Sequence, residues 1–487
     1  MNTTYKEIPL TIKKSEIEAV SSLSGKDYSK FVESKDYILL KDMVTHLVGD
    51  SLLSTDFLQE DVCNKYRFIK TGNLFEHRLL IDYSSTEYCK PVGTNCLEDE
   101  DILIAKDGNG AGLGEISIYF KDESHITDYI CGEILRIRVK PEYDKWFLVG
   151  ILKSNYFKEY LDIVTPGGST LRHSKLLALD FKVPYSVEKK EEMNYISLLV
   201  QNLLDKEKQL QNKRKQIDNL ISSEIKNNCN LKNISGYKLP KSSKIKEEVR
   251  VDTGIYSEEY FNLVQMITNH NNGHYYLDRS SVGPGKTPKD YKYTLEKRDN
   301  TYLWITPKNI TSLELNYETF INTKEATKVK EFDIILSGIR YLGYGFFVDK
   351  DTTVYSNQNT LVVSHSEDPK EQIFLLAFFT STVGKKLQYS WRVDGLVPII
   401  YRDDFIKIPI PNFEEGKRNE IVNLYYNNEF LLNNDISASN YLRVMKSRNN
   451  NIGIYQLNKE ILFLKKKIQE TVDAFVLGKE ISIKWHK

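Results

Sequence analysis

The sequence predicts a mixed α+β fold, with two β-rich domains separated by long antiparallel coiled-coil helices and related by a pseudo-two-fold internal repeat. Three observations lead to this prediction. The chain has 487 residues, which is more than one ordinary core needs. Two long stretches of it repeat each other in the same order. Each stretch is followed by a run in which apolar residues recur about every 3.5 positions, as in coiled coils.

The first part of the repeat consists of short strands. Residues 66–74 correspond to residues 302–310, because aromatic, isoleucine and asparagine positions fall in matching order. The apolar strand at 101–105 returns at 333–337, and each copy then continues with glycines and a β-rich run. These two runs cover residues 115–120 and 346–348. Several independent matches in one order indicate a duplication.

The second part of the repeat aligns without gaps. Residues 147–184 correspond to residues 374–411 at a constant shift of 227 positions. Apolar residues at helical spacing predict helices over 144–162 and 369–389. Alternating apolar residues then predict a closing strand at the end of each aligned segment. Each copy is therefore expected to contain short strands, a helix and a closing strand.

A long helix of a different kind follows each copy. Residues 188–227 hold no proline or glycine, and Gly478 ends the second helix. Lys206 and Lys213 interrupt the first apolar seam. We expect the two helices to pair antiparallel and to hold the β-rich domains at opposite ends, with packing of each helix on its own domain as the alternative. The predicted seam comprises Ile196, Leu199, Leu203, Leu210 and Ile217 in the first helix and Ile454, Leu457, Ile461, Leu464 and Ile468 in the second.

The repeat divides the chain into five expected parts. The first β-rich domain covers 1–187, the central coiled-coil helix 188–230 and a linker 231–247. The second β-rich domain covers 248–413, and a C-terminal helical region with the second coiled-coil helix covers 414–484. This order places one long helix after each β-rich domain.

Composition excludes several classes of protein. Sixty-seven basic residues balance 67 acidic ones, so net charge alone decides nothing about a nucleic-acid partner. The five cysteines show no C-x-x-C spacing, which predicts reduced, structural thiols and no zinc site. No stretch has the ~20 apolar residues of a membrane span, and residues 1–14 lack the apolar core of a signal peptide. We expect a soluble, cytoplasmic protein.

Polar loops at matching places in the two copies carry the residue types that read DNA. Arginine and lysine pair with guanine, asparagine and glutamine pair with adenine, and small hydroxyl groups contact phosphate. The glycine-rich loops after the strands at 101–105 and 333–337 would let the backbone approach a groove. Plain hairpin turns and solvated surface charges remain the alternatives. The candidate DNA-binding residues are Lys70, Thr71, Asn73, Lys106, Asn109, Ser169, Thr170, Arg172, His173, Lys286, Thr287, Lys289, Lys308, Asn309, Arg340, Tyr341, Tyr344, Arg392 and Arg402.

Catalytic motifs find little support in the sequence. The glycines within 107–114 precede a strand, whereas a dinucleotide-binding turn must lead into a helix. The Gly-Lys-Thr at 285–287 is similar to the end of a P-loop, but Ser280 stands where the leading glycine belongs and Pro288 follows directly. Neither an Asp/Asn/Ser-Pro-Pro-aromatic methyltransferase motif nor an H-E-x-x-H zinc motif occurs. We expect a chain that has no catalytic centre and binds no cofactor or metal itself.

With these motifs in this order, the chain resembles the specificity (S) subunit of Type I restriction–modification systems, or a closely related methyltransferase specificity subunit. The resemblance covers essentially the whole chain, and the doubled order of the motifs is more specific than any one of them. The motifs are 302–310 (Tyr-Leu-Trp-Ile-Thr-Pro-Lys-Asn-Ile), 101–108 (Asp-Ile-Leu-Ile-Ala-Lys-Asp-Gly), 168–173 (Gly-Ser-Thr-Leu-Arg-His) and 408–411 (Ile-Pro-Ile-Pro), which runs into Glu414 and Glu415.

The resemblance implies a function and a set of partners. Each β-rich domain would be a target-recognition domain that reads one half of a split, asymmetric site on double-stranded DNA, and the helices would set the gap between the halves. The helices would also dock two methyltransferase (modification) subunits, which modify adenine with S-adenosylmethionine, and then motor-nuclease (restriction) subunits. Related systems that methylate without Type I cleavage use similar subunits, so the partner class stays open.

The chain departs from the typical pattern of these subunits at two places. The first copy has Lys-Thr-Gly at 70–72 where the second has Thr-Pro-Lys at 306–308. An Asn-rich insertion at 426–451 precedes the second long helix.

Two other functions stay open at this point. One is a coiled-coil scaffold for protein interactions, which explains the balanced charge equally well. The other is a decoy that mimics a specificity subunit and occupies its methyltransferase.

Overall fold

In the computed structural model, the chain forms two compact units. Unit 1 comprises Met1–Lys208, Leu432–Ser447 and Phe463–Lys487, and unit 2 comprises Gln209–Leu431 and Arg448–Leu462. The boundaries after Lys208, Ser447 and Leu462 each fall within a helix, so each of these three helices contributes residues to both units. The structure describes residues 4–7, 30–52, 56–58, 66–74, 78–83, 86–91, 97–108, 112–121, 126–165, 172–230, 236–243, 245, 253–311, 313–350, 352–393, 395–428 and 436–485.

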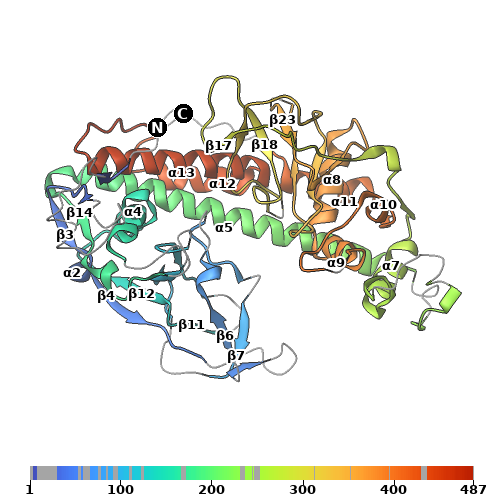
Figure 1. Cartoon of the computed structure of the whole chain (residues 1–487), viewed down its shortest axis with the longest axis horizontal. Helices are drawn as coiled ribbons and strands as arrows, with labels where there is room; N and C mark the ends of the chain where they lie inside the picture. Colours follow the sequence, from blue (N-terminus) through green and yellow to red (C-terminus); the bar gives the residue numbers. More distant parts are fainter. Residues whose placement is uncertain are drawn as a thin grey trace. The chain divides into compact units, whose positions relative to one another are not determined.

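The first sheet of unit 1 has the strand order β10-β8-β12-β4, and neighbouring strands run antiparallel. Two of its strands, β4 and β12, are labelled side by side in Figure 1. Its inner strand β8 is apolar throughout and buried along its whole length, as expected for a strand covered on both faces. The strands predicted around 101–105 and 115–120 are therefore confirmed. The strands of this sheet are β4 (Val44–Val48), β8 (Ile102–Ala105), β10 (Ile116–Ile118) and β12 (Ile134–Val139).

The second sheet of unit 1 has the order β11-β6-β7-β5, in which β6 and β11 run parallel. A buried ion pair joins these two strands, because Arg67 donates to both carboxylate oxygens of Asp128 at 2.7 and 2.9 Å. Phe68 and Ile130 of this sheet share one core with Leu103 of the first sheet. The strands are β5 (Phe57–Leu58), β6 (Tyr66–Ile69), β7 (Glu87–Cys89) and β11 (Thr127–Ile130).

Unit 2 repeats this topology. Its first sheet has the order β16-β24-β21-β22, and its second has the order β17-β19-β18-β23-β20, in which β18 and β23 run parallel as β6 and β11 do. Edge strand β20 has no counterpart among the described residues of unit 1. The predicted internal repeat is thus confirmed in the strand order. The strands are β16 (Val282–Pro284), β17 (Tyr293–Thr294), β18 (Tyr302–Ile305), β19 (Phe320–Ile321), β20 (Thr327–Val329), β21 (Ile334–Ser337), β22 (Gly345–Phe347), β23 (Val354–Ser356) and β24 (Thr360–Val363).

The helix predicted after the strands is divided in both units, so the prediction of one continuous helix was wrong. Ser154 and Ser381 occupy the same repeat position and adopt extended backbone, with ψ of 163° and 165°. Their hydroxyls donate back to the carbonyls of Ile151 and Phe378 at 2.6 and 2.7 Å, which ends the preceding helix. The helices are α3 (Lys145–Lys153) and α4 (Asn155–Val164) in unit 1 and α8 (Pro369–Thr380) and α9 (Thr382–Ser390) in unit 2.

The closing strands are shorter than their alternating pattern predicted. In unit 1 a 3₁₀ turn at Leu177–Asp180 precedes β14 (Lys182–Pro184), which pairs with β3 (Tyr37–Leu39). In unit 2 the short helix α10 (Arg402–Phe405) precedes β25 (Ile410–Pro411), which pairs with β15 (His274–Tyr275). A helical turn can bury apolar residues two positions apart, as it buries Leu179 and Phe181, so alternation alone overestimated the strands.

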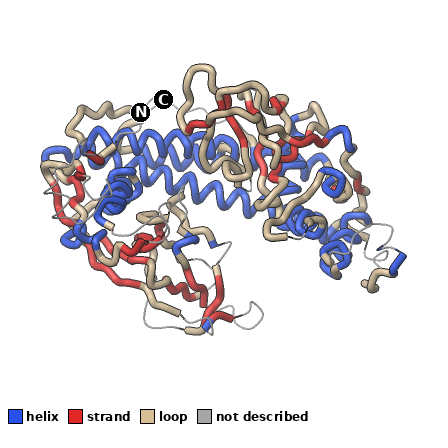
Figure 2. Tube along the Cα trace, in the orientation of Figure 1, coloured by secondary structure: helices blue, strands red, loops and turns tan. Residues whose placement is uncertain are grey.

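Two long helices follow the repeats, as predicted. They are α5 (Lys190–Asn227) and α13 (Ile454–Val476), and each is drawn as an uninterrupted helix in Figure 2. Gly478 ends α13 with φ of +67°, and the amide of Lys479 donates back to Ala474 at 2.9 Å. All ten predicted seam residues are at most 6% exposed. In the part of the chain that the structure describes, no helix combines the length and the apolar composition of a membrane span.

Within unit 1 the parts of α5 and α13 run antiparallel. The ammonium of Lys189, just before α5, lies 5.4 Å from the ring centroid of Phe475, and the carboxylate of Glu207 lies 3.4 Å from the ammonium of Lys465. Residue numbers therefore rise along one helix as they fall along the other. The remaining described elements are β1 (Lys6–Glu7), β2 (Lys30–Phe31), α2 (Leu40–Met43), β9 (Asp107–Gly108), β13 (Arg172–His173), α7 (Glu258–Thr268), α11 (Glu415–Tyr425) and α12 (Tyr441–Asn451).

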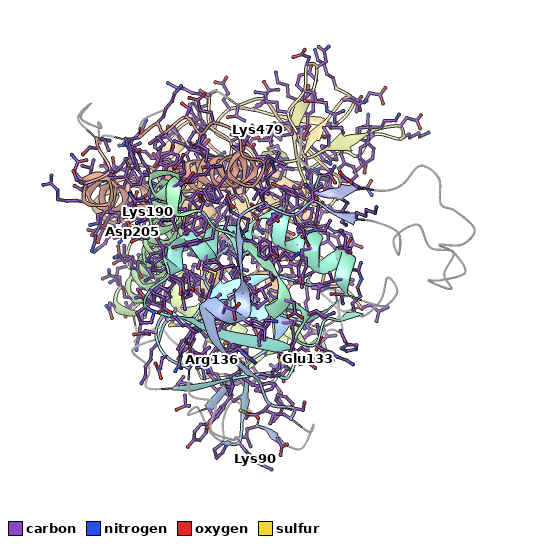
Figure 3. All side chains as sticks on the ribbon, turned by 90° about the vertical axis from the view of Figure 1, so that its left-hand side faces the viewer. Lys90, Glu133, Arg136, Lys190, Asp205 and Lys479 are labelled. Atoms are coloured by element: carbon purple, nitrogen blue, oxygen red, sulfur yellow. The ribbon has the colours of Figure 1, made fainter. Side chains whose placement is uncertain are left out.

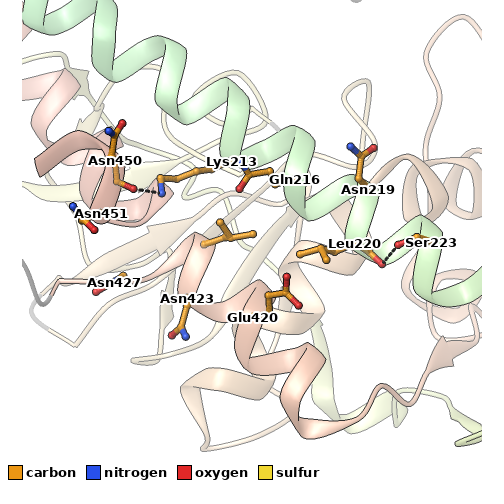
Figure 4. Close-up of a pocket in the computed structure, with 11 residues that line it drawn as sticks. Lys213, Gln216, Asn219, Leu220, Ser223, Glu420, Asn423, Asn427, Asn450 and Asn451 are labelled. Carbon is orange, nitrogen blue, oxygen red and sulfur yellow. Dashed lines mark hydrogen bonds between the residues drawn. The ribbon is translucent and has the colours of Figure 1, made fainter. Parts of the chain in front are cut away.

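The Asn-rich insertion separates α11 from α13. The repeat shift is 227 residues up to α11 but 251 residues along α13, where Ile454 and Ile461 correspond to Leu203 and Leu210. Twenty-four residues are thus added, and α12 lies among them. Within unit 2 the end of α12 packs on α5, because Lys213 donates to the carbonyl of Asn450 at 2.8 Å (Figure 4). An open pocket of about 640 Å³ beside this contact is lined by Lys213, Gln216, Asn219, Leu220, Ser223, Glu420, Asn423, Leu424, Asn427, Asn450 and Asn451.

Candidate nucleic-acid interface

A buried asparagine closes the turn after the aromatic strand in each unit. The side-chain oxygen of Asn73 accepts from the amide of Lys70 at 2.8 Å, and that of Asn309 accepts from the amide of Thr306 at 2.9 Å. Asn73 is 2% exposed and Asn309 is 1% exposed. The side-chain oxygens of these two predicted base-reading asparagines are thus used within the protein, where they hold the turn.

The loops of unit 1 that carry candidate residues meet at one place, which we name loop cluster 1. It consists of residues 49–50, 70–71, 106–108, 131–133 and 172–173. Glu133, labelled in Figure 3, lies in the turn between β11 and β12 and accepts the amide of Lys106. Four backbone hydrogen bonds join these loops. The amide of Asp50 donates to the carbonyl of Ile130 at 3.0 Å, and that of Cys131 donates to Ile69 at 3.0 Å. The amide of Lys106 donates to Glu133 at 2.9 Å, and that of Ser174 donates to Lys106 at 3.0 Å.

Unit 2 builds the corresponding loop cluster 2 with matching bonds. It consists of residues 285–287, 306–308, 338–344, 357–359 and 395–399, together with Val393. The amide of Lys286 donates to the carbonyl of Ser356 at 3.2 Å, and that of Asn357 donates to Ile305 at 3.1 Å. The amide of Gly338 donates to Asn359 at 2.9 Å, and that of Ile400 donates to Gly338 at 3.0 Å. Loops from distant parts of the sequence are thus joined in the same way in both units.

A glycine is required at the entry to each cluster. A side chain at Gly49 would place its Cβ 2.2 Å from the carbonyl oxygen of Cys131, and one at Gly285 would place it 1.9 Å from that of Asn357. Both distances are too short for any residue with a Cβ. The two glycines hold equivalent positions, so this close approach of the loops is a feature of both copies of the repeat.

Two candidate side chains of loop cluster 1 are held by internal ion pairs. The ammonium of Lys106 lies 2.5 Å from Asp107, and the guanidinium of Arg172 binds Asp162. Both side chains are only 11% exposed. In this conformation the predicted base-reading residues Lys106 and Arg172 hold the loops together and are largely buried.

Three other candidates of loop cluster 1 remain accessible. Lys70 is exposed beside Glu87, with 2.7 Å between ammonium and carboxylate. Thr71 is half-buried, and the exposed imidazole of His173 lies 3.5 Å from Asp107. This cluster therefore offers a cation, a hydroxyl and an imidazole to a partner.

Loop cluster 2 is more exposed and more aromatic. Lys286, Lys308 and Arg340 are exposed. Tyr341 stacks on Tyr344 with ring centroids 5.6 Å apart and 4° between the planes. Thr287 also belongs to the cluster, and its hydroxyl accepts from the amide of Gln358 at 3.2 Å. Cationic side chains beside stacked rings are suited to phosphates and to the edges of bases.

Arg340 stands out in loop cluster 2 because its backbone is strained. Its φ of +66° lies in the left-handed region that a residue with a Cβ seldom adopts. Its amide donates to the carbonyl of Pro398 at 2.8 Å, which ties the loop after β21 to residues 395–399. Glycine would adopt this backbone with less strain. A functional role of the guanidinium would explain why the position holds arginine instead.

Three further candidates lie outside the residues that define the two clusters, and Arg392 directly precedes Val393 of loop cluster 2. Arg392 donates to the carbonyl of Tyr389 at 3.2 Å, at the end of α9. Arg402 lies 3.5 Å from Asp403, which also binds Arg279. Lys289 is exposed, and none of the contacts found among the described residues joins it to loop cluster 2. The candidates Asn109, Ser169 and Thr170 lie outside the described residues.

An exposed apolar side chain in loop cluster 2 was not predicted from the sequence. Leu396 is 107% exposed, and Val393 and Tyr401 nearby are 39% and 56% exposed. A leucine between glycine and valine carries no signal of function in a sequence. Only the tertiary structure shows that it projects from the loop that Arg340 contacts. Apolar side chains of this kind can contact the methyl group of thymine or enter between base steps.

Three of the cysteines lie among the described residues, and all three are buried. Cys89, Cys131 and Cys229 are buried thiols outside any disulfide, whereas Cys63 and Cys96 lie outside the described residues. Burial raises the pKa of Cys131 to about 12, which keeps its thiol protonated. Within the described ranges, no three His, Cys, Asp or Glu side chains come together as metal ligands would.

Comparison with known proteins finds similarity in structure alone. No protein-family model matches the chain, and no curated protein matches it. The chain is similar to S subunits of type I restriction–modification systems. The S subunit from M. genitalium has 12% sequence identity and a TM-score of 0.34 over 89% of this chain and 95% of that chain. The HsdS subunit from Thermoanaerobacter tengcongensis has 11% identity and a TM-score of 0.28 over 91% and 97%.

A further similar structure comes from work on complex assembly and conformational transition of the type I R-M system. It has 12% identity and a TM-score of 0.26, over 91% of this chain and 99% of that chain.

Proposed function

We propose that the chain is a non-catalytic specificity subunit that recognises a bipartite site on double-stranded DNA and directs partner adenine methyltransferase subunits to it. One observation carries this proposal. Three backbone hydrogen bonds between equivalent residues, and a fourth that is offset by one residue, build loop cluster 1 and loop cluster 2, and both clusters present cationic, hydroxyl or aromatic side chains. Two equivalent reading surfaces in one chain suit two half-sites on one duplex.

The clusters share a frame but differ in their side chains, which suits an asymmetric site. Loop cluster 1 presents Lys70, Thr71 and His173, whereas loop cluster 2 presents Lys286, Lys308, Arg340 and a tyrosine pair. Because hydrogen-bonding groups at the base edges specify sequence, different side chains on one frame would select different half-sites.

The long helices are the proposed docking region for partners. A β-rich reader without catalytic residues needs a separate enzyme, and helices α5 and α13 offer extended surfaces for it. We place two methyltransferase (modification) subunits there, with S-adenosylmethionine bound by those subunits and not by this chain. Motor-nuclease (restriction) subunits would join the same complex where it also cleaves DNA.

Directed methylation tests the proposal. The chain is purified together with the methyltransferase subunit encoded beside it, given S-adenosylmethionine and genomic DNA, and the modified adenines are mapped by sequencing. We expect methylation at one bipartite sequence, with both halves altered when the chain is exchanged for another specificity subunit. Methylation spread over unrelated sequences, or methylation that does not depend on this chain, would reject the proposal.

A decoy gives a different result in the same assay. A chain that occupies the methyltransferase without reading DNA lowers methylation by a competing specificity subunit and adds no new site. A new methylated sequence that appears only with this chain excludes the decoy.

A further inference from the structure

The exposed Leu396 of loop cluster 2 lies at the tip of a closed loop. Val393 and Ile399 form an antiparallel bridge, and the amide of Val393 donates to the carbonyl of Ile399 at 2.7 Å. Leu396 is the middle residue between these two. Because its side chain is 107% exposed, it gains no hydrophobic stabilisation from the rest of the protein. Only a partner can remove it from water.

The base of this loop is held in place, although its tip is bare. The carbonyl of Pro398 accepts from the amide of Arg340 at 2.8 Å. The amide of Ile400 donates to the carbonyl of Gly338 at 3.0 Å, and Ile400 is only 2% exposed. A side chain on an anchored loop loses less conformational entropy on binding than one on a loose loop. The loop therefore presents an apolar side chain at a defined place.

The side chains of loop cluster 2 favour nucleic acid as the partner of Leu396. Arg340, whose amide holds the loop, is exposed, and Lys286 and Lys308 of the same cluster are exposed too. Asp403, which follows the loop in the sequence, is paired with Arg279 at 2.8 Å. A purely apolar partner would desolvate these three cations without compensation, whereas the phosphates that flank a base step would pair with them.

The internal repeat does not require a leucine at the tip. At the constant shift of 227 residues, Leu396 and Val397 correspond to Ser169 and Thr170 of the first copy. The first copy thus has two hydroxyl residues where the second has two apolar ones. Hydroxyl groups suit contacts with phosphate, whereas a leucine side chain has neither a donor nor an acceptor. The apolar tip is therefore a feature of the second copy in the sequence.

We propose that Leu396 is a wedge that enters between two neighbouring base pairs of the second half-site and kinks the duplex there. This inference rests on the proposed function, because it needs DNA bound at loop cluster 2. Leucine is among the side chains that DNA-bending proteins insert between base steps, and such insertion kinks the duplex by about 20–90°. Insertion would bury the leucine, while Arg340 and Lys308 would bind the phosphates beside the opened step.

This wedge would add specificity without any hydrogen bond to a base. Pyrimidine–purine steps such as TA and CA unstack most easily, so the sequence at the kink is selected by its deformability. We expect one such step in the second half-site. The other way for a leucine to read DNA is contact with the methyl group of thymine, which requires no kink.

The test uses the full chain with its methyltransferase subunit and a duplex of the bipartite sequence that methylation mapping yields. 2-Aminopurine, which fluoresces more strongly when it unstacks, replaces one adenine of the second half-site at a time, except the adenine that is methylated. Dyes at the two ends of the duplex report bending by energy transfer. We expect unstacking at one step and a bend of about 20–90°. Uracil in place of each thymine should leave the affinity unchanged.

Three variants assign these signals to the leucine. Leu396→Ser, which introduces the residue of the first copy, should abolish the unstacking, reduce the bend and weaken binding about tenfold, because the leucine is no longer buried between bases. Its unfolding temperature should stay unchanged, since the side chain is fully exposed. Leu396→Met keeps an apolar side chain of similar volume and should retain the signals. Leu239→Ser removes another leucine of unit 2, 81% exposed and outside loop cluster 2, and should leave binding and bending unchanged.

The outcomes separate this inference from the proposed function. Specific binding without unstacking, or unstacking and bending that Leu396→Ser retains in full, overturns the wedge and leaves the specificity subunit intact. Weaker binding to the uracil duplex, with no bend, assigns Leu396 to a thymine methyl group and also overturns the wedge. If the wild-type complex neither methylates nor binds one specific sequence, the proposed function fails, and the wedge fails with it.

Discussion

Equivalent residues of the two repeat copies show which loop positions are structural and which are exposed. Asn73 and Asn309 occupy equivalent positions and spend their amide groups on their own turns. Lys308, the residue before Asn309, is exposed. Neighbouring polar residues in one loop therefore have different roles, and the direction of each side chain decides which role it has.

Asn309→Ala is expected to lower the free energy of unfolding by about 1–3 kcal/mol, because it leaves buried backbone groups without partners. Urea denaturation measures this change. The control is Lys308→Ala, which removes an exposed side chain and should change stability by less than about 0.5 kcal/mol. An Asn309→Ala chain with unchanged stability and weakened DNA binding would restore the asparagine as a base contact.

Arg340 allows backbone strain and DNA reading to be separated. Arg340→Ala and Arg340→Gly are both expected to weaken reading of the second half-site by about 1–3 kcal/mol, because both remove the guanidinium. Only Arg340→Gly should also stabilise the fold, by about 1 kcal/mol, because glycine adopts the observed φ without strain. DNA binding assays with altered half-sites and urea denaturation measure the two effects. Unchanged half-site preference in both variants would remove Arg340 from the interface.

The buried Lys153 predicts a pH dependence of stability. Its pKa is lowered from 10.5 to about 8 by burial, with Lys158 adding to the decrease and Glu115 and Glu207 opposing it. Between these values the unfolded chain binds more protons than the folded chain, so the free energy of unfolding should rise with pH. Urea denaturation of the wild type and of Lys153→Met between about pH 7 and pH 10 tests this, and only the wild type should show this contribution. Parallel pH profiles for the two chains would contradict it.

Helices and strands differ in how directly the sequence specifies them. The apolar seam of α5 and α13 was predicted residue by residue, and all ten seam positions are buried. Lys213 interrupts that seam and is nevertheless buried. Its ammonium donates a hydrogen bond to the carbonyl of Asn450, which compensates part of the cost of burial, and burial lowers its pKa. The break at Ser154 and Ser381 was not predicted, because a serine inside a helical pattern is compatible with an unbroken helix.

Leu210→Asp is expected to destabilise the chain by more than about 3 kcal/mol, because it places a carboxylate at a buried seam position. Leu210→Met preserves volume and apolarity and should cost less than about 1.5 kcal/mol. Circular dichroism during thermal unfolding measures both. A Leu210→Asp chain as stable as Leu210→Met would show that this position faces solvent.

At the scale of the whole molecule, balanced charge and DNA binding are compatible because charge acts locally. Sixty-seven basic and 67 acidic residues leave no net charge, yet Lys286, Lys308 and Arg340 lie in one loop cluster. Phosphate contacts depend on the charges that reach the duplex and not on the sum over the chain.

DNA affinity is therefore expected to fall steeply with salt despite the neutral composition. If about six phosphates are neutralised, affinity should drop by about 10³ between 50 and 200 mM salt. Fluorescence anisotropy with a labelled duplex measures the slope. The triple variant Lys286→Gln, Lys308→Gln, Arg340→Gln should have a smaller slope. A chain without measurable DNA affinity at low salt would favour the protein-interaction scaffold.

The sequence by itself determined the α+β class, the duplicated order of strands and helices, and the buried seam of the long helices. These features are periodic or repeated, so local patterns of apolar residues specify them. Only the tertiary structure decided which polar residues face a partner. Asn73, Lys106 and Arg172 are of residue types that read DNA, but their side chains are engaged in internal hydrogen bonds and ion pairs. Leu396 is not of such a residue type and is fully exposed, because bridges to segments distant in sequence hold its loop at the surface. Exposure depends on contacts between distant segments, and no local pattern records those contacts.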